Sequence, residues 1–300
     1  MMHVVPVPGS FDDRGLDQVA QGLGQWPPPD RLLVDARGTT WASPYGLCSL
    51  LTLGQAVAEL GLPKPRFAVP DSDDTRSYWS RVGFFQHAVE YFEIVGRVPK
   101  RTGDAPTDTL LPIMPIRAVA DVHEVVGRLR EAATRILTTE LHVEARATMG
   151  FAMTLSEACQ NIVEHAGTAG WVAAQVYFWK RRLGRKVAVI AVSDAGIGFR
   201  RSLEATEAKR VGDRWGDGAA LESALIHSVS RFRDPGRGQG LKGIKGYLLR
   251  WHGKISIRSG TARLSILPEW DDDDPLAEHL PFFPGSQLQI TIPSQEPKTR

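Results

Sequence analysis

SEACQNIVEHA, residues 156–166, decides how the larger part of this chain is interpreted. On a helix of 3.6 residues per turn, the apolar residues of this stretch share one face, and Glu157, Asn161 and His165 line the edge beside it. Polar side chains at that spacing can border a pocket. The same spacing is common on purely structural helices, so the rest of the chain has to decide between the two interpretations.

A second motif is VSDAGIGF, residues 192–199. The apolar run before it predicts a central strand that ends at Asp194, and Gly196 and Gly198 follow at once. A carboxylate at a strand end can accept a hydrogen bond from an exocyclic amine, and glycines let the backbone approach a ligand or adopt a positive φ. The D-x-G-x-G pattern also occurs in ordinary turns.

A third motif is GRGQGL, residues 236–241. Gly236, Gly238 and Gly240 alternate just before Leu241 and the helix predicted for residues 242–251. Backbone N–H groups at the positive end of a helix form a cradle for an anion. The motif lacks the Gly-Lys-Ser/Thr end of a Walker loop, and no strand precedes it as in the dinucleotide-binding motif.

In this order, the three motifs resemble the nucleotide-binding elements of the GHKL superfamily, the histidine-kinase-like, gyrase-like and Hsp90-like ATPases. Residues 156–166 match its N box (E-x3-N-x3-H-A), and the other two motifs match its first and second glycine boxes. Gly285 and Ser286 stand where the family usually has Gly-Thr, and the serine keeps the hydroxyl. The resemblance covers roughly residues 110–293, and its His-Ala ending looks most like the anti-sigma-factor serine kinases.

The resemblance implies ATP and Mg²⁺ as cofactors. Asn161 would coordinate Mg²⁺, which prefers oxygen ligands, and Glu157 would be the catalytic general base. Asp194 would bind the adenine amine, with room for the base beside Gly198 and support from Ser286. The amides of the second glycine box would hold phosphate oxygens, and His165 would make local hydrogen bonds. The implied nucleotide-binding set is Asn161, His165, Asp194, Gly196, Gly198, Gly236, Gly238, Gly240, Leu241 and Ser286.

Residues 118–300 are predicted to form an α/β sandwich with helices on one sheet face, the Bergerat fold of this superfamily. Helices are expected first, over residues 119–137 and 144–165, and mostly antiparallel strands after them. The strands are expected at residues 172–179, 187–193, 255–259, 262–267 and 287–293.

Three further features of this half carry expectations. The strand at 262–267 alternates apolar and polar residues, which predicts that it buries one face only. The acidic run Asp271–Asp274 is predicted to be a solvated loop, because its spacing does not fit a calcium loop. The long connection at 199–235 is predicted to be a lid with a helix over residues 219–230.

Residues 1–98 are predicted to form a small α/β domain, and the proline- and glycine-rich residues 99–117 a linker. Within the first domain, a strand at 32–34 precedes an amphipathic helix that starts near Gly46 and ends near Gly61. This stretch resembles a STAS domain, the fold of anti-sigma-factor antagonists. Tyr45 replaces the serine that is phosphorylated in that family, and its hydroxyl would project further out. A generic small α/β domain is the alternative.

Composition narrows the function classes. Lys and Arg number 36 against 34 Asp and Glu, a net charge of +2 that does not suggest a nucleic-acid binder. Apolar residues make up 42% of the chain, which is typical of a globular protein. The two cysteines exclude a disulfide framework. Without a long apolar run or a leader pattern, the expected location is the cytoplasm, away from membranes.

The predicted function is therefore an ATP·Mg²⁺-binding signalling protein, either a slow ATPase or a protein serine/threonine kinase of anti-sigma-factor type. The alternative is a non-catalytic switch in which ATP orders the lid and so controls a protein partner. Both interpretations imply a protein partner or substrate, and a homodimer stays open. A two-component histidine kinase is poorly supported, because no helical hairpin with a phosphoacceptor histidine precedes residue 156.

Overall fold

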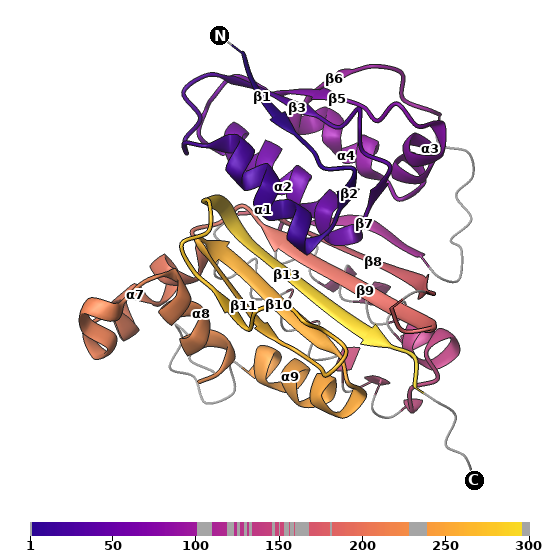
Figure 1. Cartoon of the computed structure of the whole chain (residues 1–300), viewed down its shortest axis with the longest axis vertical. Coiled ribbons are helices and arrows are strands. Elements are labelled where there is room, and N and C mark those ends of the chain that lie inside the picture. Colours follow the sequence, from indigo (N-terminus) through magenta and orange to yellow (C-terminus); the bar gives the residue numbers. More distant parts are fainter. Residues whose placement is uncertain are drawn as a thin grey trace.

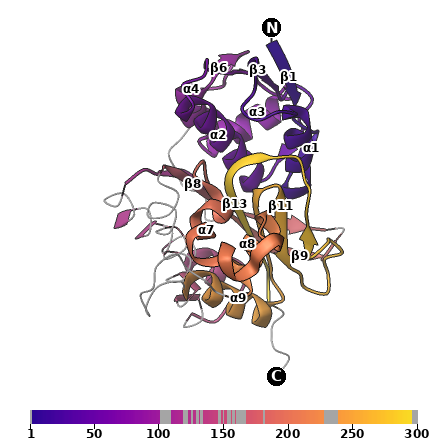
Figure 2. The same ribbon diagram turned by 90° about the vertical axis from the view of Figure 1, so that its left-hand side faces the viewer.

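The structure is a computed structural model that describes residues 2–100, 110–118, 168–180, 182–227 and 239–295, with shorter stretches and single residues between 123 and 159. It is a mixed α/β protein with a four-stranded, a seven-stranded and a two-stranded sheet. The N-terminal domain lies against one face of the seven-stranded sheet, and helix α9 lies beyond the other face (Figures 1 and 2).

The N-terminal domain is built on a parallel sheet of order β1-β3-β5-β6. Strands and helices alternate along the chain, as the sequence predicts. The strands are β1 (Met2–Pro6), β3 (Arg31–Asp35), β5 (Arg66–Ala68) and β6 (Glu93–Val95), with β2 (Ser10–Phe11) and β4 (Trp41–Ala42) forming a separate pair. The helices are α1 (Asp13–Leu23), α2 (Pro44–Glu59), α3 (Asp73–Arg81) and α4 (Phe84–Tyr91).

The second half of the chain is built on an antiparallel sheet of order β12-β11-β10-β13-β9-β8-β7. Its strands are β7 (Leu110–Ile116), β8 (Gly170–Trp179), β9 (Arg185–Asp194), β10 (Lys254–Gly260), β11 (Ala262–Ile266), β12 (Leu276–Ala277) and β13 (Phe283–Pro293). Its described helices are η1 (Ile136–Glu140), α7 (Gly198–Val211), η3 (Gly212–Arg214), α8 (Asp217–Leu225) and α9 (Gln239–Trp251). The five predicted strands are confirmed; four are longer than predicted, and β11 ends one residue earlier.

The prediction of a linker over residues 99–117 is wrong for residues 110–116, which form strand β7. Residues 110–116 pair antiparallel with β8, although Pro112 and Pro115 suggested a flexible connection. Proline removes a backbone donor, which a strand tolerates at the edge of a sheet, and β7 is an edge strand whose register shifts between Leu111 and Met114. The large sheet therefore begins before residue 118.

Helix α2 is buried all round, which the amphipathic pattern did not predict. All residues from Pro44 to Val57 are buried, because the helix lies between the two large sheets (Figure 1). A Cβ added to Gly46 would lie 2.6 Å from the ring of Phe11, and one added to Gly54 would lie 2.5 Å from the ring of Phe92. Glycine at these two positions lets neighbouring elements pack closely against the helix.

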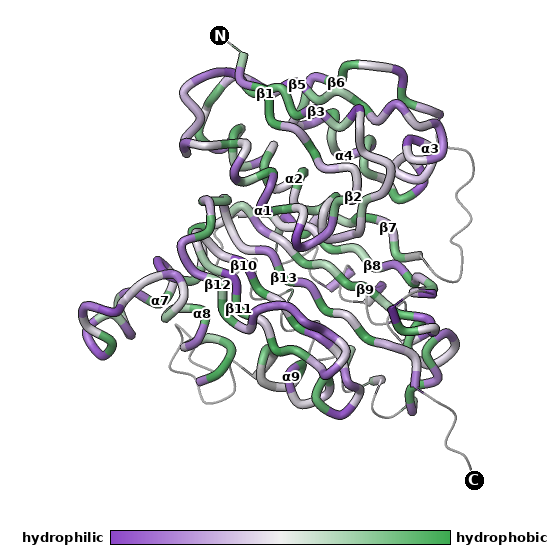
Figure 3. Tube along the Cα trace, in the orientation of Figure 1, coloured by the Kyte–Doolittle hydropathy of each residue, from purple (hydrophilic) through white to green (hydrophobic). Residues whose placement is uncertain are grey.

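The seven-stranded sheet has two faces of different chemistry, visible as alternating hydropathy along β10 and β13 (Figure 3). Apolar side chains on one face form a core with α8 and α9, while polar side chains alternate with them and face the N-terminal domain. The polar set comprises Ser193, Lys254, Ser256, Arg258, Arg263, Ser265, Gln287, Gln289 and Thr291, all buried. The prediction that strand 262–267 buries one face only is wrong, because the N-terminal domain covers the other face.

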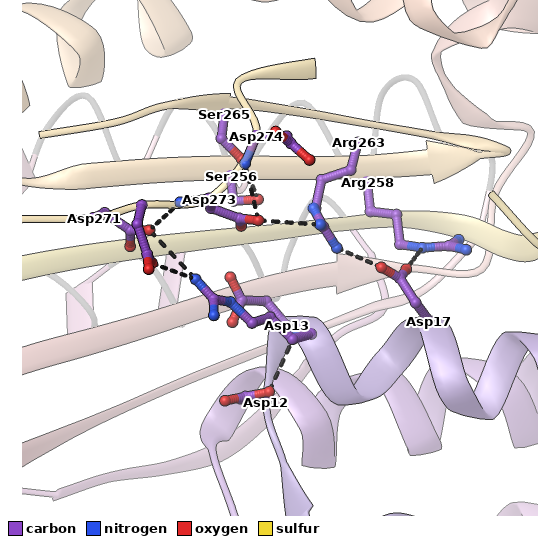
Figure 4. A network of polar contacts seen from close by, with 12 residues as sticks. Asp12, Asp13, Asp17, Ser256, Arg258, Arg263, Ser265, Asp271, Asp273 and Asp274 are labelled. Carbon is purple, nitrogen blue, oxygen red and sulfur yellow. Dashed lines mark hydrogen bonds and ion pairs between the residues drawn. The ribbon is translucent and has the colours of Figure 1, made fainter. Parts of the chain in front are cut away.

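Ion pairs join the two halves across that polar face (Figure 4). Asp17 of α1 lies 3.1 Å from Arg258 Nε and 2.5 Å from Arg263 Nη1. Lys254 Nζ lies 3.2 Å from a carboxylate oxygen of Asp13, Asp271 and Asp273. The prediction of a solvated loop is therefore wrong for Asp271 and Asp273, whose side chains are only 1% and 9% exposed. The acidic run also reaches the N-terminal domain, because Asp271 and Asp272 pair with Arg14 of α1.

Candidate functional site

The candidate site lies at the end of β9, where Asp194 and Ser286 meet. The antiparallel register of β9 and β13 places these two predicted residues directly opposite each other. Side chains alternate along a strand: Ser193 Oγ accepts a hydrogen bond of 3.1 Å from Thr52 of the N-terminal domain. Asp194 consequently points to the opposite face of the sheet, the face that carries α7, α8 and α9.

The Asp194 carboxylate is buried and has no cationic partner among the described residues. The residue is 8% exposed, and burial raises the pKa of its carboxyl group to about 7. Hydrogen bonds from the backbone N–H groups of Gly196, at 2.9 Å, and of Ser286 act in the opposite direction. The negative charge of Glu59, on α2, adds to the rise.

Two glycines beside Asp194 have positive φ and no room for a side chain. Gly285 has φ +71°, and a Cβ there would lie 1.8 Å from the carbonyl oxygen of Asp194. Gly198 has φ +74°, and a Cβ there would lie 2.8 Å from Ser259 Oγ. Glycine alone satisfies both the backbone angle and the close approach. The backbone of β13 thus passes close to the main chain of Asp194, and the start of α7 passes close to Ser259.

Ser259 completes this junction and was not among the predicted residues. Its hydroxyl accepts a hydrogen bond of 3.1 Å from the Phe199 N–H and donates one of 3.4 Å to the Gly285 carbonyl. It therefore ties the start of α7 to the end of β10 and to the turn inside β13. A serine at the end of a predicted strand, directly before a glycine, was the available signal in the sequence.

The rest of the predicted site is described only in part. Glu157, Asn161, His165, Gly236 and Gly238 lie outside the described residues. Gly240 and Leu241 lie in the first turn of α9, and Leu241 packs against the core on the helix side.

The helix predicted for residues 144–165 is helical at its described positions between 145 and 159. Phe151 and Cys159 are fully buried in the core on the helix face of the sheet. The apolar side of this segment therefore faces that core. The predicted helix at 119–137 is also helical wherever it is described from residue 123, and it ends in η1.

The described part of the connection at 199–235 consists of packed helices. Residues 198–227 form α7, a short turn and α8, and Leu203 and Leu221 are buried. The carboxylate of Asp217 accepts two hydrogen bonds of 2.8 Å from Thr261, one from the N–H and one from the hydroxyl. This half of the connection is therefore anchored to the β10–β11 turn, and residues 228–235 lie outside the described residues.

Tyr45 does not project into solvent. It is 2% exposed and faces the charged groups of Arg258, Asp13 and Asp17 at the domain interface. Burial raises the pKa of its hydroxyl far above the usual value. Ser43 caps α2, since its hydroxyl accepts a hydrogen bond of 3.2 Å from the Gly46 N–H. The turn at residues 43–47 therefore lies against the sheet, on the face opposite Asp194.

The arrangement provides a buried hydrogen-bond acceptor that is held by the backbone N–H groups of Gly196 and Ser286. Within the described ranges, no group of three or more His, Cys, Asp or Glu side chains could hold a metal ion. None of the described helices has the length and apolar character needed to cross a bilayer. No protein-family model matches this sequence, and no curated protein matches it.

Proposed function

We propose that the chain binds ATP with Mg²⁺ at the Asp194 end of the seven-stranded sheet, as a GHKL-type domain. The observation that carries this proposal is a buried carboxylate, with a pKa of about 7 and no cationic partner among the described residues, placed beside glycines that cannot be replaced. Perturbed carboxylates in such surroundings are candidates for functional groups. Asp194 would accept a hydrogen bond from the exocyclic amine of adenine.

The activity that fits this site is slow phosphoryl transfer from ATP, to water or to a serine or threonine hydroxyl of a protein. Asn161 would be the metal ligand and Glu157 the base that takes the proton of the attacking hydroxyl. When bound, Mg²⁺ supplies charge neutralisation at the phosphates. The phosphate oxygens would be held by the backbone amides around Gly238 and Gly240.

A nucleotide-controlled switch is the second candidate, and the contact behind Asp194 favours it. Next to the Thr52–Ser193 bond, Gln55 of α2 accepts a 2.9 Å hydrogen bond from Trp171 Nε1 and donates one of 3.0 Å to the Ala169 carbonyl. Trp171 lies directly opposite Ser193 in the sheet. Binding at Asp194 would thus be transmitted to a STAS-like N-terminal domain, which would act as an internal regulatory partner.

Titration calorimetry with ATP·Mg²⁺ tests the assignment of Asp194. We expect Asp194→Asn to abolish measurable binding, because the amide cannot match a buried carboxylate as acceptor. Ser193→Ala is the matched control, since the neighbouring side chain points to the other face, and it should bind ATP as the wild type does. Unchanged affinity in Asp194→Asn would remove the adenine assignment. Glu157→Ala should keep affinity and lose turnover, and equal turnover would reject the base.

The pKa of Asp194 predicts how ATP affinity depends on pH. Because the ionised carboxylate is the better acceptor, affinity should rise as the pH passes upward through about 7. If only the ionised form binds, the gain between pH 6 and pH 8 is about tenfold. Ser193→Ala should show the same rise. A flat or falling affinity in both proteins would contradict the role of this carboxylate.

A further inference from the structure

The outer face of the small parallel sheet is open, which is unusual for this kind of sheet. Parallel sheets are normally covered on both faces, but α1, α2 and α4 all lie on the side that faces the large sheet (Figure 1). Leu32 and Val34 of β3 belong to the core on that side, so Leu33 between them points outward. Val4 of β1 is 50% exposed on the same domain.

A pocket of about 310 Å³ opens at the carboxyl ends of β3, β5 and β6. Its lining combines an apolar part, including Leu33 and Val95, with the four arginines Arg37, Arg66, Arg76 and Arg97. Asp71 is the single acidic residue in the lining. The carboxyl ends of parallel strands are where open α/β sheets bind their ligands, and the volume is at the lower end of the usual range for small-molecule sites.

Two of the arginines are held in fixed positions. Asp35 accepts two hydrogen bonds from Arg37, from Nε at 2.9 Å and from Nη2 at 2.6 Å. Arg76 Nη1 donates to the carbonyl oxygens of Pro70, at 2.6 Å, and Asp71, at 2.9 Å. A guanidinium fixed in this way loses little side-chain entropy when it binds a ligand. Arg76 Nη2 also pairs with Asp73, and only the N–H groups that these bonds leave unused are available to a ligand.

The other two arginines have more free donors. Arg66 Nε lies 3.2 Å from Glu93 Oε1, and its terminal nitrogens have no partner among the described residues. Arg97 forms no ion pair or hydrogen bond with the described part of the chain and is exposed at the rim. Acids outside the lining pair with three of the arginines, and Asp71 lies in the lining itself, so the formal charges nearly balance and the site offers oriented donors rather than excess positive charge. Arginine forks match the geometry of phosphate oxygens.

We propose that this pocket binds the phosphate group of a small phosphomonoester, whose uncharged body lies on the apolar part of the lining. The site is separate from the one assigned to ATP. The lining residues belong to the small sheet, α3 and adjoining loops, and α2 and the large sheet lie between that small sheet and α9 (Figure 1). The N-terminal domain would therefore take its own ligand, whatever occupies the other half of the chain.

Chemical-shift mapping on the full-length chain tests the site, with ribose 5-phosphate, ribose and inorganic phosphate as probes at millimolar concentration. We expect shifts at the ends of β3, β5 and β6 with ribose 5-phosphate, weaker binding of inorganic phosphate and none of ribose. Equal affinity for inorganic phosphate would reduce the site to a free-phosphate site and overturn the phosphomonoester assignment. No binding of either phosphate compound would overturn the proposal altogether.

Substitutions locate the binding. Arg97→Gln should weaken ribose 5-phosphate at least tenfold without unfolding the domain, because Arg97 has no partner to lose among the described residues. Arg250→Gln, at an exposed arginine on α9, is the matched control and should change nothing. Asp194→Asn should also leave this binding intact. Binding that is lost in Asp194→Asn and kept in Arg97→Gln would place the phosphate at the ATP site, overturning this proposal and leaving the proposed function standing.

Discussion

The two faces of the seven-stranded sheet are equally buried and are made of different residues. On the helix face, β13 contributes Leu288, Ile290 and Ile292, and on the face toward the N-terminal domain it contributes Gln289 and Thr291. Four of these five are less than 9% exposed and the fifth is at 9%. Burial therefore does not follow from hydropathy here. One face of the sheet forms the core of the C-terminal half, and the N-terminal domain covers the other face.

The difference between the two faces indicates how the two halves of the chain are joined. Interfaces between domains resemble protein–protein contacts and are more polar than cores. A buried ionic face contributes little net stability, because desolvation offsets much of the attraction, but removing one partner is costly. The helix face should consequently respond to lost volume, and the interface face to lost partners.

The largest expected effect is on the helix face, where Ile290 and Thr291 form an adjacent pair. Ile290→Ala should lower the free energy of unfolding by about 3 kcal/mol, since it leaves a cavity in a fully buried core. Thr291→Val should be neutral or slightly stabilising, because the buried Thr291 hydroxyl has no hydrogen-bond partner in the described structure. Urea unfolding of both variants measures this, and similar losses in the two would break the distinction between the faces.

The sequence predicts the helix face better than the interface face. Apolar runs and apolar alternation located five strands of the sheet. The resemblance to the GHKL superfamily implied that Asp194 and Ser286 would act together, and β9 and β13 place them opposite each other. Alternation assigned Arg263 to solvent, and the acidic run assigned Asp271 to a solvated loop, because a charged residue has the same hydropathy whether it contacts water or a buried ion-pair partner. Strand β7 was predicted to be part of a linker for a related reason. Pro112 and Pro115 are compatible with a linker and also with an edge strand.

The next effect belongs to the interface. Asp17→Ala leaves Arg258, which is fully buried, and Arg263, which is 6% exposed, without their shared carboxylate. Removing one partner of such a group costs about 3 kcal/mol or more when it is fully buried, and we expect about 2 kcal/mol because the Asp17 side chain is 23% exposed. Thermal unfolding of the full chain measures the loss.

Asp272→Ala is the control for this variant. Asp272 also pairs with an arginine of α1, Arg14, at 3.0 Å, but its side chain is 88% exposed. Surface pairs contribute about 0 to 1 kcal/mol, so this variant should unfold almost as the wild type does. If Asp272→Ala lowered stability as much as Asp17→Ala does, the stability of the interface would depend on the distance between the charges and not on their burial.

The smallest effect is expected where the interface contains a neutral hydrogen bond. The hydroxyls of Tyr78 on α3 and Tyr177 on β8 lie 3.1 Å apart, and burial raises the pKa of both, so both are protonated at neutral pH. Each Tyr→Phe change should cost about 1 kcal/mol, because it leaves one buried hydroxyl without its partner, and the double variant should cost little more than either one. A double-mutant cycle measures the coupling. Additive losses would mean that these hydroxyls act independently, and that their hydrogen bond does not couple the two domains.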